Sequence, residues 1–153
     1  MHETTKVVVF LMGSQPYGIP IENVLGIEKL HTITEVPKTS DFIKGVINLR
    51  GEITPVLDLK ERLQLGETAH TEQTRILIVT ISDMQVGLIV DAATDVMDID
   101  SAIVEDAPEV INGVKDSFLK GVVKLADRLL ILLDLEHILN FDEVNEVNEI
   151  IQE

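Results

Sequence analysis

The chain has 153 residues, enough for one domain with its own core, and 27 acidic against 12 basic side chains give it a net charge of −15. This charge argues against nucleic acid and anionic membrane surfaces as partners, because binding to phosphates requires basic groups that displace counterions. The sequence has no Cys, no signal-peptide pattern and no apolar run near the length of about 20 residues that spans a bilayer, so we expect a cytoplasmic protein without direct membrane insertion.

Short runs rich in Val, Ile and Leu, separated by Gly, Asp, Asn or Pro, are typical of β-strands joined by turns. In chain order, the sequence predicts strands over residues 7–12, 17–21, 45–49, 53–57, 75–81, 86–90, 121–125 and 129–133. Residues 58–65 and 134–141 are predicted to be short helices, because each begins at an Asp that is suited to cap the first turn. In the acidic tail over residues 142–153, Val144, Val147 and Ile151 share one face at helical spacing.

The most informative feature is an internal repeat. Residues 42–63 and 118–139 align without a gap, and nine of the 22 positions are identical. Upstream, residues 17–21 are similar to residues 86–90. We therefore expect a single domain of two similar halves, about 7–63 and 75–141, joined by a polar linker over 64–74. Two small β-barrels that pack together follow naturally, because closure removes exposed sheet edges. Because duplicated barrels can exchange strands, the sequence leaves open which barrel contains the first strand, residues 7–12.

No arrangement of side chains in the sequence predicts catalysis, a metal or a cofactor. His2, His31, His70 and His137 lack the spacing of a metal pair and are expected at the surface or in packing contacts. Six acidic residues within 95–109 do not fit a calcium loop, and they predict a solvated acidic loop. Neither a phosphate-binding glycine motif nor a nucleophile elbow is present. A small barrel enzyme or a metabolite binder is the alternative from another class of protein.

Four segments carry a resemblance to a known family. Residues 42–59 read F-I-K-G-V-I-N-L-R-G-E-I-T-P-V-L-D-L and resemble the central motif of the CheW-like chemotaxis coupling proteins, F-I-x-G-x-x-N-L-R-G-x-I-x-P-V-x-D-L. Residues 17–24, 86–96 and 129–139 resemble the first hairpin, the V-G-x-x-V-D segment, and the closing strand and helix of that family. The match covers about residues 7–141. The resemblance implies an all-β fold of two packed five-stranded SH3-like barrels with short helices and no active site.

The resemblance also implies two protein partners. One is the regulatory domain of the histidine kinase CheA, and the other is the cytoplasmic signalling tip of methyl-accepting chemotaxis receptors. The implied function is a non-catalytic scaffold that couples these receptors to CheA at receptor arrays in bacterial chemotaxis.

The receptor-binding groove that the resemblance implies lies between the two barrels. Its matching positions are Val24, Arg50, Gly87, Ala93 and Val96. Arg50 would present its guanidinium to a receptor carboxylate or to a carbonyl at a helix end. The alternative is that Arg50 is simply an exposed residue of a hairpin turn, and that Val24 and Val96 belong to the core.

The kinase-binding face that the resemblance implies lies around the N-L-R-G hairpin. Its matching positions are Ile33, Gly45 and Ile53. Gly45 could alternatively serve only a tight entry into its strand, since Gly121 takes the same place in the repeat.

The sequence departs from the family pattern after the first hairpin. Many members carry an acidic residue where this chain has Gly26, so the acidic contact is either lost or supplied by Glu28. Ala93 is smaller than the usual Val, and we expect a roomier groove. The initial Met and the short acidic tail favour a standalone protein over a piece of a CheA-like or CheV-like protein.

Overall fold

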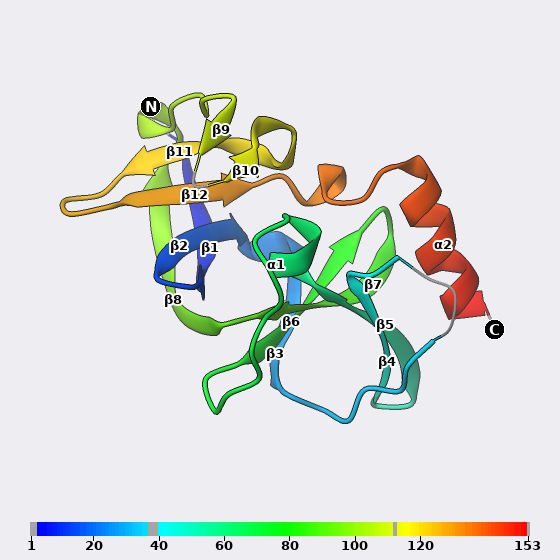
Figure 1. Cartoon of the computed structure of the whole chain (residues 1–153). Coiled ribbons are helices and arrows are strands. Elements are labelled where there is room, and N and C mark those ends of the chain that lie inside the picture. Colours follow the sequence, from blue (N-terminus) through cyan, green and yellow to red (C-terminus); the bar gives the residue numbers. More distant parts are fainter. Residues whose placement is uncertain (1–2, 37–39, 112, 153) are drawn as a thin grey trace.

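The computed structural model describes residues 3–36, 40–111 and 113–152, so the expectations for His2 and for the last residue of the tail lie outside the described residues. The described chain forms two five-stranded sheets, which confirms the predicted all-β class (Figure 1). In hydrogen-bonded order, sheet A consists of β11 (Leu119–Lys124), β12 (Leu129–Leu133), β2 (Gln15–Pro20), β1 (Thr4–Met12) and β8 (Ala92–Asp100). Sheet B consists of β3 (Val24–Lys29), β6 (Arg75–Ile81), β7 (Met84–Val90), β5 (Glu52–Asp58) and β4 (Ile43–Leu49).

Short elements connect the strands. β9 (Val110–Ile111) and β10 (Val114–Lys115) form a small ribbon, and single 3-10 turns lie at Ile21–Asn23, Ser101–Ile103, Asp116–Phe118 and Leu135–His137. The helix predicted over residues 58–65 is confirmed as α1 (Leu59–Arg62). The carboxylate of Asp58 accepts hydrogen bonds from the first backbone N–H groups of α1, as its position predicts.

The helix predicted over residues 134–141 is wrong, because the chain makes only the 3-10 turn Leu135–His137 there. The carboxylate of Asp134 lies 2.6 Å from Nδ1 of His137 and does not cap the turn. A new helix, α2 (Phe141–Gln152), starts next. Its start is fixed by a capping box, in which Asn140 and Glu143 each accept a hydrogen bond from the backbone N–H of the other. The predicted helical tail is thereby confirmed, with Val147 on its buried face.

The acidic loop predicted over residues 95–109 is wrong in its first part, because residues 92–100 form β8 against β1. In the second half of β8, Asp98 is exposed while Ile99 is buried and Met97 is half-buried, which is the alternation of a strand with one buried face. The edge strand β3 was likewise not among the predicted strands.

The two copies of the repeat exchange their first hairpins. The β1–β2 hairpin belongs to the first copy but pairs with β8 and β12 of the second copy. The β6–β7 hairpin of the second copy pairs with β3 and β5 of the first. The registers match: Leu132 lies opposite Gly18 in sheet A, and Val56 lies opposite Gly87 in sheet B. Each sheet therefore contains strands from both halves of the sequence.

Closed barrels were predicted, and the sheets are open instead. Each sheet ends in two edge strands, β11 and β8 in sheet A and β3 and β4 in sheet B. The chain after β3 returns to β4 through one isolated bridge, between Thr34 and Val46, and the chain after β8 returns to β11 through Glu105 and Val122. At each of these places one bridged residue pair is present, whereas a closed barrel requires a continuous ladder of hydrogen bonds between two strands.

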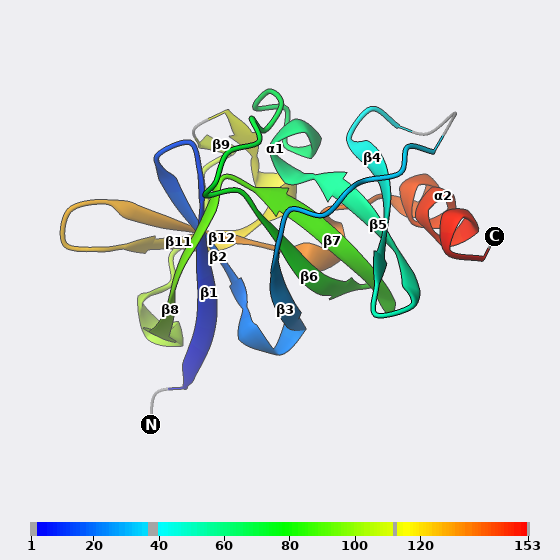
Figure 2. The same cartoon turned by 90° about the horizontal axis from the view of Figure 1, so that it is seen from below.

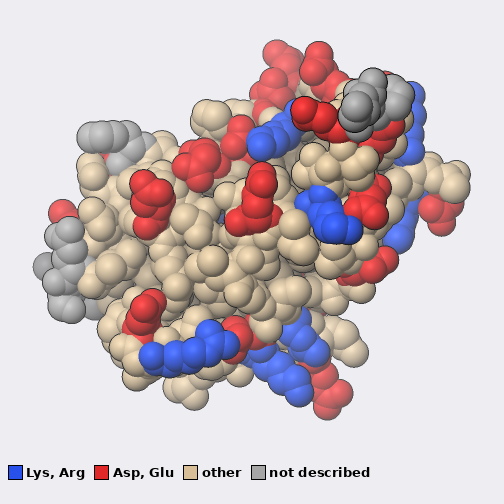
Figure 3. Space-filling view, turned by 180° about the vertical axis from the view of Figure 1, so that it is seen from behind, with Lys and Arg blue, Asp and Glu red and all other residues tan. Residues whose placement is uncertain are grey.

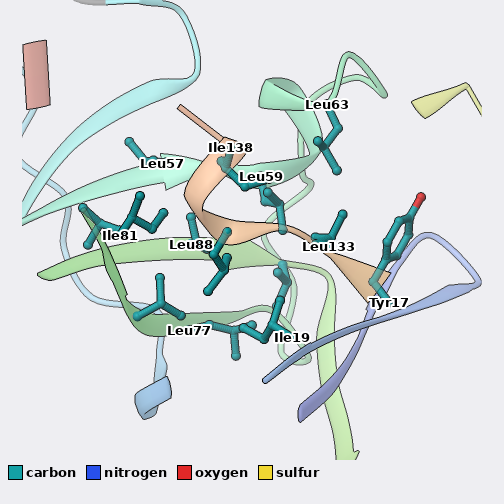
Figure 4. Packing of buried hydrophobic residues seen from close by; sticks show 14 of the residues in the cluster. Tyr17, Ile19, Leu57, Leu59, Leu63, Leu77, Ile81, Leu88, Leu133 and Ile138 are labelled. Atoms are coloured by element: carbon teal, nitrogen blue, oxygen red, sulfur yellow. The ribbon is translucent and has the colours of Figure 1, made fainter. Parts of the chain in front are cut away.

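Buried apolar side chains form three clusters. The largest lies between the sheets, where Tyr17 and Leu133 of sheet A pack with Leu57, Leu77 and Leu88 of sheet B (Figure 4). Each sheet also has a smaller cluster, here named its inner cluster, on the face that is turned away from the shared cluster. These clusters are Ile47, Leu49, Val56, Ile76, Ile78 and Ile89 in sheet B, and Val7, Val9, Ile99, Val123 and Leu130 in sheet A. The shared cluster makes the two sheets one packed unit.

Arg62 connects α2 to the two packed sheets. Its guanidinium lies over the rings of Phe42 and Phe118, 5.0 and 4.8 Å from their centroids. Its Nη2 lies 2.8 Å from Oε1 of Glu143 in α2. Because Phe42 and Phe118 occupy the same position of the repeat, one side chain connects both copies to the terminal helix.

Candidate interaction surfaces

Strand β3 forms an exposed apolar edge of sheet B. It pairs with β6 on one side, and Leu25 and Ile27 are 58% and 46% exposed. Exposed and half-buried residues alternate along β3, so the two large side chains share its outward face. An edge strand that exposes both large apolar side chains and unpaired backbone groups is a natural surface for another protein.

Strand β8 is the counterpart of β3 in sheet A. Alignment of the two halves pairs Val24 with Ala93 and Ile27 with Val96. Val24 and Ala93 are half-buried against the cluster between the sheets, and Val96 is 47% exposed. The structure therefore brings Val24 and Ala93 to the shared core and leaves Val96 at the surface.

Gly87 lies inside sheet B rather than on an open groove. It is buried, and a Cβ atom at this position would lie 2.7 Å from Cγ2 of Ile76. Gly18 takes the same place in sheet A, packed against Leu132 and Val7. Close packing explains the glycine at both positions, and a contact of Gly87 with a receptor stays a prediction.

Arg50 occupies the tight turn between β4 and β5. Its φ of 51° and the φ of 88° at Gly51 are those of a type I′ hairpin, and the Gly51 N–H donates to Oδ1 of Asn48 at 2.9 Å. The Arg50 side chain is 79% exposed, and its Nη2 lies 3.5 Å from Oε2 of Glu28 in β3. The turn thus holds a cation beside the apolar edge of β3.

Gly45 and Ile33 lie together where the chain returns to β4. The Thr34 and Val46 backbones exchange hydrogen bonds of 2.9 and 2.8 Å there. At Gly45, which has a φ of +147°, a Cβ atom would lie 2.1 Å from the Thr34 carbonyl oxygen and 2.9 Å from Cγ2 of Ile33. Only glycine fits, so this position has a structural role whatever it binds. Ile53, 47% exposed, lies nearer the turn of the same hairpin.

Glu28 lies close to the place of the missing acidic residue. A Cβ atom at Gly26 would have Oε2 of Glu28 as its nearest neighbour, at 3.8 Å. The Glu28 carboxylate also lies 3.4 Å from Nε2 of His31, besides its contact with Arg50. A carboxylate is therefore available at this point of β3, although Gly26 itself carries none.

The predicted sites surround β3. Strand β8 and the β4–β5 hairpin lie on opposite sides of β3 in both ribbon views (Figures 1 and 2). Figure 3 shows one face of the molecule, on which acidic groups are scattered, most densely at the upper right, around an area of uncharged side chains. Large exposed apolar residues that were missed are Leu25 and Ile27, together with Ile21, Ile103 and Val110. The alternation Leu25, Gly26, Ile27 is the signal that indicates an edge strand.

The structure has two open sheets with a shared core, and apolar side chains are exposed on the edge strands. The described residues contain no cluster of three metal-ligating side chains. These features define a β-sheet interaction module. In the part of the chain that the structure describes, no helix has the length and apolar character that a membrane crossing requires.

Comparison with known proteins places this module in a family. The model of the CheW-like domain matches residues 6–143. The chain is 41% identical over 135 residues to the chemotaxis protein CheW of Bacillus subtilis, which covers 88% of this chain and 86% of that protein. It is 33% identical over 143 residues to CheW of Klebsiella aerogenes, with 94% and 86% covered. The crystal structure of the scaffolding protein TtCheW from Thermoanaerobacter tengcongensis is similar, with a TM-score of 0.84, 37% identity, and 92% of this chain and 91% of that chain covered. The chain belongs to the CheW-like family of chemotaxis scaffold proteins.

Proposed function

We propose that this chain is a non-catalytic cytoplasmic scaffold that couples methyl-accepting chemotaxis receptors to the histidine kinase CheA at receptor arrays. One observation carries the proposal: exposed apolar side chains lie on β8 of sheet A and on β5 of sheet B, at opposite sides of β3, in one packed unit. Two separate surfaces on one body are what a coupling protein needs.

The receptor surface in this proposal consists of β3, β8 and Arg50. The signalling tip of a receptor is helical, and a helix presents an apolar stripe that can cover Ile27 and Val96. Val24 and Ala93, which are half-buried against the cluster between the sheets, are the other apolar positions of this surface. Arg50 gives the surface a cation for a receptor carboxylate.

The kinase surface in this proposal consists of strands β4 and β5, without the turn residue Arg50, and the chain that returns to β4. Ile53 contributes the exposed apolar contact, and Ile33 and Gly45 fix the course of the backbone beside it. The regulatory domain of CheA is the proposed partner of this surface.

Two charge substitutions test whether the surfaces are separate. Val96→Glu should lower the affinity for a receptor signalling fragment about tenfold or more and leave binding of the CheA regulatory domain unchanged. Ile53→Glu should do the reverse. Val110→Glu is the matched control, because it adds the same charge at a residue that is also exposed and belongs to neither surface. Isothermal titration calorimetry with each partner measures the result. Equal losses for both partners in either variant would contradict the proposal.

A further inference from the structure

Sheet A holds a cavity of about 350 Å³ on the face that carries its inner cluster. The cavity lies where β1 begins and β8 ends, near the N label of Figure 1. Its wall is mostly apolar and includes Val7, Gly18, Ile99, Val104 and Leu132. Pockets that bind small molecules have volumes of about 300–1,000 Å³, so this cavity lies at the small end of that range.

The corresponding positions of sheet B carry different side chains, as the repeat shows. Val7 in sheet A corresponds to Ile76 in sheet B, because Val7 pairs with Pro20 and Ile76 pairs with Ile89 in matching registers. By the same registers Val9 corresponds to Ile78.

Each of these two Val-for-Ile differences removes one methylene from the inner cluster of sheet A. Val123 and Ile47 differ in the same way in the aligned segments of the repeat. Pro20 in place of Ile89 removes further volume, while Leu132 in place of Val56 returns one methylene. The two copies thus differ in the side chains that line the corresponding regions, and three of the differences place a smaller aliphatic side chain in sheet A.

The cavity lining also contains polar side chains, one of which is a cation. Lys120 on β11 is exposed and lines the cavity together with the hydroxyl-bearing residues Thr5 and Ser101. No carboxylate of the described residues forms an ion pair with Lys120, whereas its neighbour Lys124 lies 3.5 Å from Oε2 of Glu105. An uncompensated ammonium group beside an apolar wall matches an amphiphile with an acidic head group.

We propose that this cavity binds a small aliphatic molecule with one acidic head group, such as a medium-chain carboxylate. The aliphatic chain packs between Val7, Ile99 and Leu132. The carboxylate lies at Lys120, within reach of the Thr5 and Ser101 hydroxyls. Gly18 is part of the lining, and a Cβ atom there would lie 3.2 Å from Cδ2 of Leu132, in tight contact with the cavity wall.

Octanoate is the probe for this site, and 1-octanol is the probe without the charge. With the full chain and octanoate below its micelle concentration, methyl NMR should show saturable shifts at Val7, Ile99, Val104 and Leu132. Lys120→Gln should weaken octanoate about two- to fivefold and leave octanol unchanged, as expected for one exposed ion pair. Lys124→Gln is the matched control and should change neither affinity.

A substitution in the cavity wall provides a second test of the site. Val7→Ile introduces the residue of sheet B into the cavity wall and should weaken both probes about fourfold, the value of one displaced methylene. Val9→Ile makes the same change in the same inner cluster, outside the lining, and should leave both affinities unchanged. Thermal unfolding checks that both variants fold. The proposal is overturned if neither probe shifts these methyl signals, if the shifts fall on Leu25 and Ile27 instead, or if the two Ile variants behave alike.

Discussion

Arg50 combines a constrained turn conformation with an exposed side chain. Its left-handed backbone is set by the type I′ turn with Gly51, and its side chain makes one exposed contact with Glu28. Exposed ion pairs contribute about 0–1 kcal/mol, so this contact does not explain why a bulky side chain occupies a turn that glycine or asparagine would fit better. Receptor binding, as proposed above, would explain it.

Arg50→Ala should therefore weaken receptor binding about five- to tenfold while the free energy of unfolding stays within about 0.5 kcal/mol of the wild type. Arg128→Ala is the matched control, since Arg128 lies in the exposed β11–β12 turn, the counterpart hairpin of the repeat. Titration with a receptor signalling fragment and urea unfolding measure the two quantities. Unchanged receptor affinity in a folded Arg50→Ala protein would remove Arg50 from the receptor surface.

Tyr17 is a residue whose ionisation reports on the shared core. Burial raises the pKa of its phenol to about 12, whereas the phenol of an unfolded chain titrates near about 10. Between these values the unfolded chain loses its proton and the folded chain keeps it. Stability from this group is thus complete below about pH 10 and is lost as the pH rises toward about 12, by about 2 to 3 kcal/mol in total.

Phenolate absorbance tests this directly, because Tyr17 is the single Tyr and the chain has no Trp. The folded protein should titrate near pH 12 and the urea-unfolded protein near about pH 10. Tyr17→Phe should lose the corresponding part of the alkaline destabilisation. Coincident titrations in the two states would show that the ring is not buried between the sheets.

At the scale of elements, two glycines fix where the chain folds back onto each sheet. Gly45 lets the Thr34 carbonyl approach β4, and Gly121 lets the Glu105 carbonyl approach β11, where a Cβ atom would lie 2.6 Å away. The conserved geometry in both copies shows that the close approach is a property of the fold.

Gly45→Ala should destabilise the protein by about 2 kcal/mol or more, because the new methyl group displaces the Thr34 strand return and the φ of +147° suits only glycine. Gly26→Ala is the matched control, with its nearest neighbour at 3.8 Å, and should change stability by about 0.5 kcal/mol or less. Urea unfolding compares the variants. If Gly45→Ala keeps full stability yet loses kinase binding, Gly45 acts as a contact residue instead.

The sequence predicts the eight strands with continuous apolar runs, and it predicts α1 from its Asp58 cap, because these signals are local. It misses β3 and β8, whose apolar residues alternate with polar ones or with glycine and expose one face. The helix over 134–141 fails because Asp134 binds His137 and a second cap follows at Asn140. For the candidate site, the motif indicates Val96 and Ile53 at the surface, yet it gives no sign that Gly87 is buried.

At the scale of the whole molecule, exchange of the first hairpins joins the two halves. The exchange is not predictable from the repeat, because pairing within a copy and pairing between copies offer the same residues to each strand. Its consequence is mechanical: each sheet contains strands from both halves, and α2 is fastened through Arg62 to both. A force applied at one surface therefore acts on a single packed body, which suits a rigid coupling element.

We propose that this body binds receptor and kinase at the same time through different surfaces. Methyl NMR with each partner added separately, and then with both, tests it most directly. The account predicts that a receptor signalling fragment shifts the methyl signals of Ile27 and Val96, that the CheA regulatory domain shifts those of Ile33 and Ile53, and that both sets persist when the partners are present together. Displacement of one partner by the other, or shifts confined to a single sheet with both partners, would contradict it.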